Sequence, residues 1–321
     1  MFYNAQRLHL TLGYLSPKEY EAQLEEKLMI NPHEDTIRLP ERPGIPSSEI
    51  FIKQYIQNKL GDRNTVILLP GGPGNDMGMY DDPSMSIAQV FFQAADVILF
   101  DPRACGKSEQ CNIEFCSLNH YIDDVEAIRQ YFNIDPERFF VFGQSYGSIV
   151  ALGYAIRFPL SLKKLLLIGA VASSDFYEEA KTQLHKIANS EQTAFAEKLW
   201  NGSFTDAKEE IADFYRLMSP LYSCSFEPGE PPLEIGYNVD VMNYGWGTFL
   251  KGFDYTNELS NVRCKTLILW GESDWIMPRL HINLVSGLIP DCSLKVYSKC
   301  MHMLWMDRWG KFVDDSLAFL T

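Results

Sequence analysis

Long apolar runs and an excess of positive charge are both missing from this 321-residue sequence. No apolar run reaches the roughly 18 residues that a membrane-spanning helix needs, so we expect no contact with a membrane interior. Asp and Glu number 42 against 28 Lys and Arg, which gives a formal net charge of −14. Nucleic acids and anionic membrane surfaces both attract clustered positive charge, so neither is expected as a partner. The start of the chain has no apolar core and no small-residue cleavage site, and a secretory signal is not predicted.

Paired cysteine motifs are missing as well, although seven cysteines are present. An odd number of cysteines cannot all form disulfides within the chain, and no C-x-x-C occurs. We therefore expect reduced thiols and a cytoplasmic protein. Zinc binding by the cysteines within 105–116 stays an alternative, but the usual ligand spacing is lacking. Neither a metal nor a cofactor is predicted.

Short, fully apolar runs alternate with helix-like segments through most of the chain. With 46% hydrophobic residues the sequence can bury a sizeable core. Continuous apolar runs separated by helices indicate a parallel sheet that is covered on both faces. The runs that predict strands lie at 65–69, 97–100, 138–142, 165–168, 266–270 and 294–297.

Residues 172–259 interrupt this alternation with helical and aromatic segments. The sequence therefore predicts a core formed by residues 29–171 and 260–321, with a helical insertion at 172–259. Residues 1–28 are polar and helix-like, without a strand pattern, and are predicted to be a separate N-terminal extension.

A G-x-S-x-G motif at residues 143–147 places Ser145 directly between a predicted strand and a predicted helix. This is the setting of a nucleophile elbow, a turn so tight that side chains at the flanking glycines would clash with the backbone. The turn leaves the serine hydroxyl exposed above the sheet edge. An ordinary serine N-cap between turn glycines is the alternative.

A serine nucleophile needs a base, and the base needs a carboxylate to orient it. On this architecture the chain order is Ser, then Asp or Glu, then His. His302 lies in the loop after the last predicted strand and is preferred to His281, which falls inside a predicted helix and should point sideways or outward. Asp274 follows the strand at 266–270 and is preferred to Glu272. The alternatives are a core histidine and a turn aspartate.

Two backbone N–H groups are expected to form the oxyanion hole. One should come from Tyr146, the residue after the nucleophile, and the other from the loop at 70–74. We assign the second to Gly72, because Pro73 has no N–H to donate. An ordinary strand-to-helix turn is the alternative. Arg103 is expected to brace loops by ion pairing, and Cys105 to be structural.

Taken together, these segments resemble the proline iminopeptidase family of serine peptidases. The resemblance rests on GGPG, DPRACGKS, GQSYGS and GESD, and on the late histidine, and it covers residues 36–171 and 260–321 well. It implies an α/β-hydrolase fold, with a mostly parallel sheet, helices on both faces and a helical cap over the active site. It also implies removal of an N-terminal residue, usually proline, from short peptides without a cofactor. The family triad falls on Ser145, Asp274 and His302.

The sequence departs from the family pattern at three positions. Pro70 stands where the family has a histidine, Trp275 stands where some members have a glutamate, and Asn243 occupies the place of a cap glutamate. An aminopeptidase needs a group to pair with the substrate ammonium. Glu234 or Asp240 is a candidate for that role, while Trp246, Trp275 and Asn243 are candidates for lining the substrate pocket.

A second resemblance concerns residues 1–25, which are similar to the C-terminal end of an insertion-sequence transposase. It implies that the hydrolase proper begins near Met29. The predicted function is that of a serine hydrolase acting through an acyl-enzyme, most specifically an aminopeptidase that releases N-terminal proline from short peptides. An esterase or amidase on small acyl substrates is the alternative, and a non-catalytic ligand-binding protein of the same fold is a remote one. The oligomeric state is not predicted.

Overall fold

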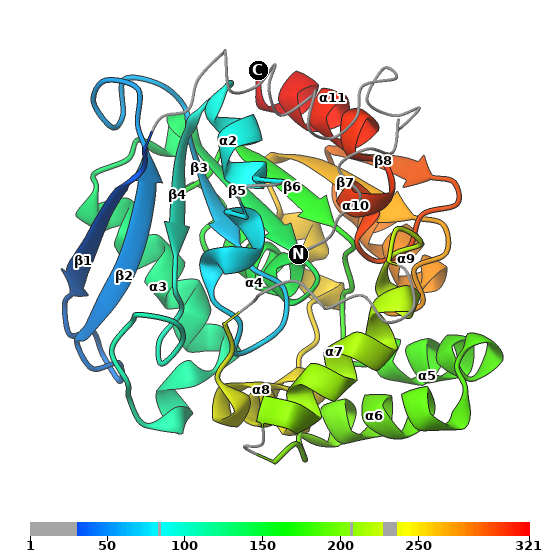
Figure 1. Ribbon diagram of the computed structural model, residues 1–321. Helices are drawn as coiled ribbons and strands as arrows, with labels where there is room; N and C mark the ends of the chain where they lie inside the picture. Colours follow the sequence, from blue (N-terminus) through cyan, green and yellow to red (C-terminus); the bar gives the residue numbers. More distant parts are fainter. Residues whose placement is uncertain (1–30, 83–84, 206–207, 227–235) are drawn as a thin grey trace.

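The computed structural model describes residues 31–82, 85–205, 208–226 and 236–321. In this part of the chain strands alternate with helices and form an eight-stranded sheet (Figure 1). The strands are β1 (His33–Leu39), β2 (Ser48–Tyr55), β3 (Thr65–Leu69), β4 (Asp96–Phe100), β5 (Phe139–Gln144), β6 (Lys164–Ile168), β7 (Lys265–Gly271) and β8 (Cys292–Tyr297). The α-helices are α2 (Ile87–Phe92), α3 (Leu118–Tyr131), α4 (Tyr146–Arg157), α5 (Phe176–Ile187), α6 (Ser190–Asn201), α7 (Lys208–Tyr222), α8 (Val239–Gly247), α9 (Arg279–Leu288), α10 (Leu304–Asp307) and α11 (Trp309–Leu320). The 3-10 helices are η2 (Met77–Tyr80), η3 (Ile113–Cys116), η4 (Pro136–Arg138), η5 (Phe249–Lys251) and η6 (Thr256–Asn261).

The sheet order is β1-β2-β4-β3-β5-β6-β7-β8. All pairs from β4 to β8 are parallel, which confirms the mostly parallel sheet predicted from the apolar runs. β1 and β2 pair antiparallel with each other, and β2 is also antiparallel to β4. The sequence did not predict these two strands. Most of β1 is exposed, so its residues lack the apolar run that marks the central strands.

The two faces of the sheet carry separate hydrophobic clusters. In β3, Ile67 and Leu69 belong to the cluster shared with α3, α4 and α9, whereas Val66 and Leu68 belong to the cluster shared with α2, α10 and α11. Successive side chains of a strand point to opposite faces, so a strand buried on both faces must be apolar throughout. This explains why the central strands could be predicted from the sequence as continuous apolar runs.

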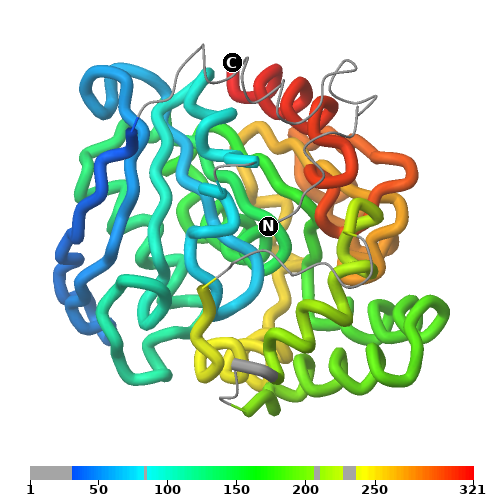
Figure 2. Tube along the Cα trace, viewed as in Figure 1, coloured from blue at the N-terminus to red at the C-terminus, as the bar shows by residue number. Residues whose placement is uncertain are grey.

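Helices α5, α6, α7 and α8 follow β6 in the chain and precede β7. They gather together at one side of the molecule, at the bottom of Figure 2, while β1 and β8 form the opposite edges of the sheet. These helices fall within the range 172–259 predicted as a cap, and their assignment to a separate cap domain stays a prediction. The predicted extension at 1–28 lies outside the described residues. In the described residues, no helix is long and apolar enough to cross a membrane.

Candidate active site

Ser145 lies in a sharp turn between β5 and α4. Its backbone angles are φ 55° and ψ −120°, a conformation that a residue with a side chain rarely adopts. A Cβ on Gly143 would lie 2.2 Å from the carbonyl oxygen of Gly147, and a Cβ on Gly147 would lie 2.0 Å from that of Leu69. Both glycines are therefore required by close backbone contacts, and the turn holds Ser145 at the carboxyl end of a central strand.

Asp274 and His302 come together at the carboxyl ends of β7 and β8, two strands that lie side by side. His302 Nδ1 lies 2.9 Å from Asp274 Oδ2, and both side chains are almost completely buried. The other carboxylate oxygen, Oδ1, accepts the backbone N–H groups of Ile276 and Met277 at 2.9 and 3.0 Å. The carboxylate is thus fixed on both sides, and its Oδ2 orients the imidazole ring.

The second ring nitrogen of His302 faces the elbow. His302 Nε2 lies 3.2 Å from the side-chain Nε2 of Gln144, the residue before Ser145. An amide N–H can only donate and a carboxylate can only accept, so the two contacts together fit a neutral ring with its proton on Nδ1 and a lone pair on Nε2. In the described residues no hydrogen bond joins Ser145 Oγ to His302, although both side chains line the same pocket.

The two competing candidates lie elsewhere. Glu272 is exposed and forms an ion pair with Arg279 at 3.4 Å. His281 lies in α9, but it is buried rather than pointing sideways or outward as expected, because this helix packs its face against the core. Its Nδ1 has no hydrogen-bond partner, and burial lowers the pKa of its imidazole.

The loop after β3 lies against the same pocket. Gly72 has φ 71°, and a Cβ there would lie 2.6 Å from the Asn75 side-chain nitrogen. Asn75 Nδ2 also donates to the carbonyl of Gly71 at 2.8 Å, which closes the loop onto itself. Gly72 and Ser145 both line the pocket, and Tyr146 begins α4 next to Ser145. The two backbone groups proposed for the oxyanion hole therefore flank the serine.

The pocket beside Ser145 is mostly apolar. Its polar residues are Asn75, Gln144, Ser145 and His302, and no Asp or Glu belongs to the described residues that line it. The aromatic side chains in its wall are Trp200, Phe214, Tyr215, Tyr222, Trp246 and Trp275.

Of the five residues named as candidates for contact with substrate, Trp246 and Trp275 line this pocket. Asn243 does not: its amide accepts from the backbone N–H of Phe204 at 3.1 Å and donates to the Phe204 carbonyl at 2.7 Å. The expectation for Asn243 is corrected for this reason, since both ends of its side chain hold α8 to the end of α6. Glu234 lies outside the described residues. Asp240 is exposed on α8 and is not part of the pocket wall.

Sequence reasoning missed two polar residues of the pocket, Asn75 and Gln144. Their side chains are 7% and 1% exposed. Asn75 Oδ1 and Gln144 Oε1 are buried without a hydrogen-bond partner. Buried oxygens of this kind are rare in folded proteins and need an explanation. Only their positions in the sequence could have indicated these two residues: Asn75 directly follows the PGGPG loop, and Gln144 directly precedes Ser145.

The end of α7 is joined to the loops that carry Asp274 and His302. Trp275 Nε1 donates to the carbonyl of Leu221, and the N–H of Met303 donates to the carbonyl of Tyr222, both at 2.8 Å. Asp307 accepts the Ser223 hydroxyl at 2.6 Å and the N–H of Met301 at 2.7 Å. The end of α7 is therefore bonded to the loop of Asp274 through Leu221, to the loop of His302 through Tyr222, and to α10 through Ser223 and Asp307.

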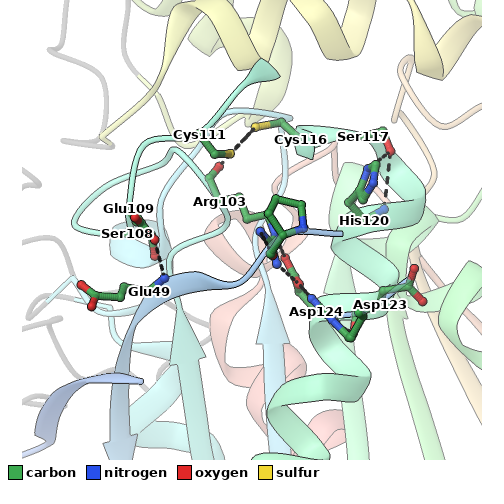
Figure 3. Close-up of polar contacts among 12 residues, drawn as sticks. Glu49, Arg103, Ser108, Glu109, Cys111, Cys116, Ser117, His120, Asp123 and Asp124 are labelled. Atoms are coloured by element: carbon green, nitrogen blue, oxygen red, sulfur yellow. Dashed lines mark hydrogen bonds and ion pairs between the residues drawn. The ribbon is translucent and has the colours of Figure 1, made fainter. Parts of the chain in front are cut away.

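Arg103 has the bracing role expected of it. Its guanidinium donates to Asp124 in α3 through Nε at 2.6 Å and Nη2 at 2.9 Å, and to the carbonyl of Pro46 at 3.1 Å (Figure 3). Arg42 contacts the same carboxylate. The ion pair is buried and joins the loop after β4 to α3. Among the described residues, no group of three or more His, Cys, Asp or Glu is arranged to hold a metal ion.

Comparison with known proteins identifies the fold family. The model of the alpha/beta hydrolase fold family matches residues 64–308, most of the chain. The chain belongs to this family. Hydrolases of this fold carry their serine, acid and histidine in that chain order, and Ser145, Asp274 and His302 follow one another in the same order here.

Curated relatives of this α/β hydrolase are named proline iminopeptidases. One from Pestalotiopsis fici, PfmaB, is 27% identical over 77% of this chain and 88% of the relative. One from Heyndrickxia coagulans is 27% identical over 82% of this chain and 92% of the relative. Among solved structures, a hydrolase from Bacillus anthracis has a TM-score of 0.68 at 20% identity, covering 89% of this chain and all of that one. The proline iminopeptidase of Mycobacterium smegmatis has a TM-score of 0.62 at 19% identity, covering 90% and 97%. These structures support the shared fold.

Proposed function

We propose that this protein is a serine hydrolase that works through an acyl-enzyme and releases N-terminal proline from short peptides. The observation that carries the proposal is the buried His302–Asp274 pair, whose histidine lines one pocket together with a serine on an elbow. The names of the curated relatives support the choice of proline.

In the proposed mechanism His302 acts first as a base. Its Nε2 gives up the contact with Gln144 and accepts the proton of the Ser145 hydroxyl, whose oxygen attacks the substrate carbonyl. Catalytic hydrogen bonds often tighten only when substrate is bound, which fits the missing Ser145–His302 bond. The N–H groups of Gly72 and Tyr146 stabilise the oxyanion, and Asp274 stabilises the imidazolium. His302 then protonates the leaving amine, and water releases the acyl group by the same route.

The pocket offers a place for a prolyl group. The aromatic wall suits the flat, apolar pyrrolidine ring, and the two unpartnered oxygens, Asn75 Oδ1 and Gln144 Oε1, can accept hydrogen bonds from its ammonium group. Neutral amide oxygens would then take the place of the glutamates that the family resemblance implies. Burial of an ammonium without any partner would cost several kcal/mol.

The test compares two substrates that differ in one group. Prolyl-aminomethylcoumarin carries a ring NH₂⁺ where cyclopentanecarbonyl-aminomethylcoumarin carries CH₂. We expect kcat/KM for the prolyl amide to exceed that for the carbocycle by about 10²-fold or more, as in sites built to bond a polar substrate group. Ser145→Ala should lower kcat by about 10⁴-fold or more. Asn75→Leu should remove the preference for proline, whereas Asn283→Leu, the same change at an exposed position of α9, should leave it unchanged.

An esterase or amidase is the second candidate, favoured by the absence of Asp and Glu from the described residues of the pocket wall. This candidate predicts rapid hydrolysis of a small uncharged ester and no turnover of the prolyl amide. The same Ser145→Ala variant must abolish the ester hydrolysis. If wild type and Ser145→Ala hydrolyse neither substrate, or hydrolyse both equally, the serine-hydrolase proposal fails.

A further inference from the structure

Three thiols form a cluster near the loop at 70–74, here called the oxyanion loop, and one of them, Cys116, lines a cavity with Gly72 and Gly74 of that loop. Cys105, Cys111 and Cys116 all belong to the segment between β4 and α3 and pack in one small cluster with Val241 of α8. The sulfurs of Cys111 and Cys116 are 3.7 Å apart and face each other in Figure 3. Cys116 is buried at the end of η3, and Cys111 is partly exposed. One thiol of the pair is thus open to reagents and the other is shielded directly beside it.

The surroundings favour reaction at Cys111. The hydrogen bond with Cys116 and the positive charge of Arg103 lower the pKa of the Cys111 thiol, although burial opposes them. Burial raises the pKa of Cys105, and contact with Cys111 together with burial raises that of Cys116. The exposed thiol of the pair is therefore the one that forms a thiolate most readily, and thiolates are the reactive form of cysteine.

We propose that Cys111 and Cys116 form a site of reversible oxidation, at which hydrogen peroxide converts the two thiols into a disulfide that slows the hydrolase. The Cys111 thiolate attacks one peroxide oxygen and becomes a sulfenic acid, and hydroxide leaves. The Cys116 sulfur then attacks the Cys111 sulfur, a disulfide forms, and water leaves with the Cys116 proton. Two electrons pass from the thiols to peroxide, and a dithiol reductant returns them.

The cross-link would act on the oxyanion loop through the cavity behind it. Cys116 lines this cavity together with Gly72, Tyr146 and Val241. A disulfide requires the sulfurs to approach from 3.7 Å to about 2.05 Å. Any part of this approach that Cys116 makes changes the cavity wall that it shares with Gly72 and Tyr146. Misplacement of an oxyanion donor is costly, and we expect kcat to fall by about five-fold or more.

The site itself is tested without any assay of activity. The full chain is reduced, exposed to hydrogen peroxide, alkylated, digested and mapped by mass spectrometry. We expect loss of two alkylatable thiols and a cross-linked Cys111–Cys116 peptide that is lighter by about 2 Da than the reduced pair, both reversed by dithiothreitol. Cys111→Ser should abolish the cross-link. Cys224→Ser, which removes an exposed thiol elsewhere, should leave it intact.

Two results would overturn the proposal. One is oxidation of Cys111 to a sulfinic acid without the cross-link, and the other is consumption of Cys224 before Cys111. Cys111→Ala serves as a second variant, since a change at this partly exposed position leaves the buried Cys116 packing in place.

The effect on turnover rests on the proposed function and is measured separately with whichever ester or amide the wild type hydrolyses. We expect peroxide to lower kcat in the wild type, dithiothreitol to restore it, and Cys111→Ser to resist the loss. A cross-link that leaves kcat unchanged would overturn the claim that the disulfide slows the enzyme. A protein that hydrolyses nothing fails the proposed function and still reports on the cross-link.

Discussion

Around Ser145 the shape of the pocket is set by backbone, whereas the opposite wall consists of side chains from α6, α7 and α8. At the elbow, any side chain on Gly143 or Gly147 would meet backbone atoms at 2.2 Å or less. In the wall, Trp200, Phe214 and Trp246 contribute rings from three different helices. The glycines beside Ser145 therefore tolerate almost no substitution, whereas each aromatic residue of the opposite wall can be replaced separately.

The two parts of the pocket therefore have different consequences, one for the geometry of the reaction and the other for the choice of substrate. Backbone contacts between β3, β5 and α4 fix the geometry that any acyl transfer on this fold requires. The aromatic wall decides which acyl group fits. Enzymes of one fold family can then share a triad while accepting different substrates, which is why the family alone does not determine the substrate.

The largest expected effect comes from placing a methyl group at the elbow. Gly147→Ala puts a Cβ 2.0 Å from the carbonyl oxygen of Leu69, and we expect a loss of roughly 3 kcal/mol or more in the free energy of unfolding, together with loss of activity. Urea unfolding and ester hydrolysis measure the two effects.

Gly287→Ala is the matched control for the elbow variant. No atom lies within 4 Å of a Cβ at Gly287, which is inside α9. Alanine is the better helix former, so we expect a gain of about 0.5–1 kcal/mol in stability and unchanged activity. Equal behaviour of the two variants would contradict the view that backbone contacts limit the elbow.

A smaller effect is expected in the aromatic wall. Phe214→Leu keeps an apolar side chain but removes a ring from the pocket. We expect KM for a prolyl substrate to rise by about ten-fold and kcat for a small acetyl ester to stay unchanged. Steady-state kinetics on the two substrates measures the split. A fall in kcat for the ester would show that the wall and the elbow are not separable.

The smallest effect concerns a histidine outside the pocket. Burial lowers the pKa of His281 below its ordinary value of 6.5, while Asp175 and Glu179 oppose this shift. Below pH 6.5 the unfolded chain binds the proton more readily than the folded one, so the free energy of unfolding decreases as the pH falls. His281→Leu should flatten this decrease by about 1 kcal/mol or less between pH 7 and pH 5, judged by urea unfolding. An equally steep decrease in the variant would assign the pH dependence to other groups.

The central strands could be predicted because burial on both faces leaves a continuous apolar run. β1 was not predicted because its first four residues are exposed. The sequence of such an edge strand resembles that of a polar loop.

Local motifs indicated the residues proposed to react and two rings of the pocket wall, Trp246 and Trp275, but not the rest of the wall. Ser145 and Asp274 sit in short patterns next to strands, and strand order brings those patterns to one edge of the sheet. Trp200 and Phe214 reach the pocket only through the packing of α6 and α7, which no sequence spacing records. Asn243 was named as a pocket residue because the family resemblance puts it in the place of a cap glutamate, yet its side chain bonds the backbone of Phe204.

The bonds at the end of α7 constrain how a substrate can enter. The carbonyl groups of Leu221 and Tyr222 hold Trp275 and Met303, the neighbours of Asp274 and His302. Lifting this end of the helix would break those bonds and disturb the orientation of the imidazole. A substrate could therefore not enter from this side while the imidazole of His302 stays oriented to act as the proposed base. In the proposed mechanism, an acyl-enzyme would therefore form only while this end of α7 keeps its bonds to the neighbours of Asp274 and His302.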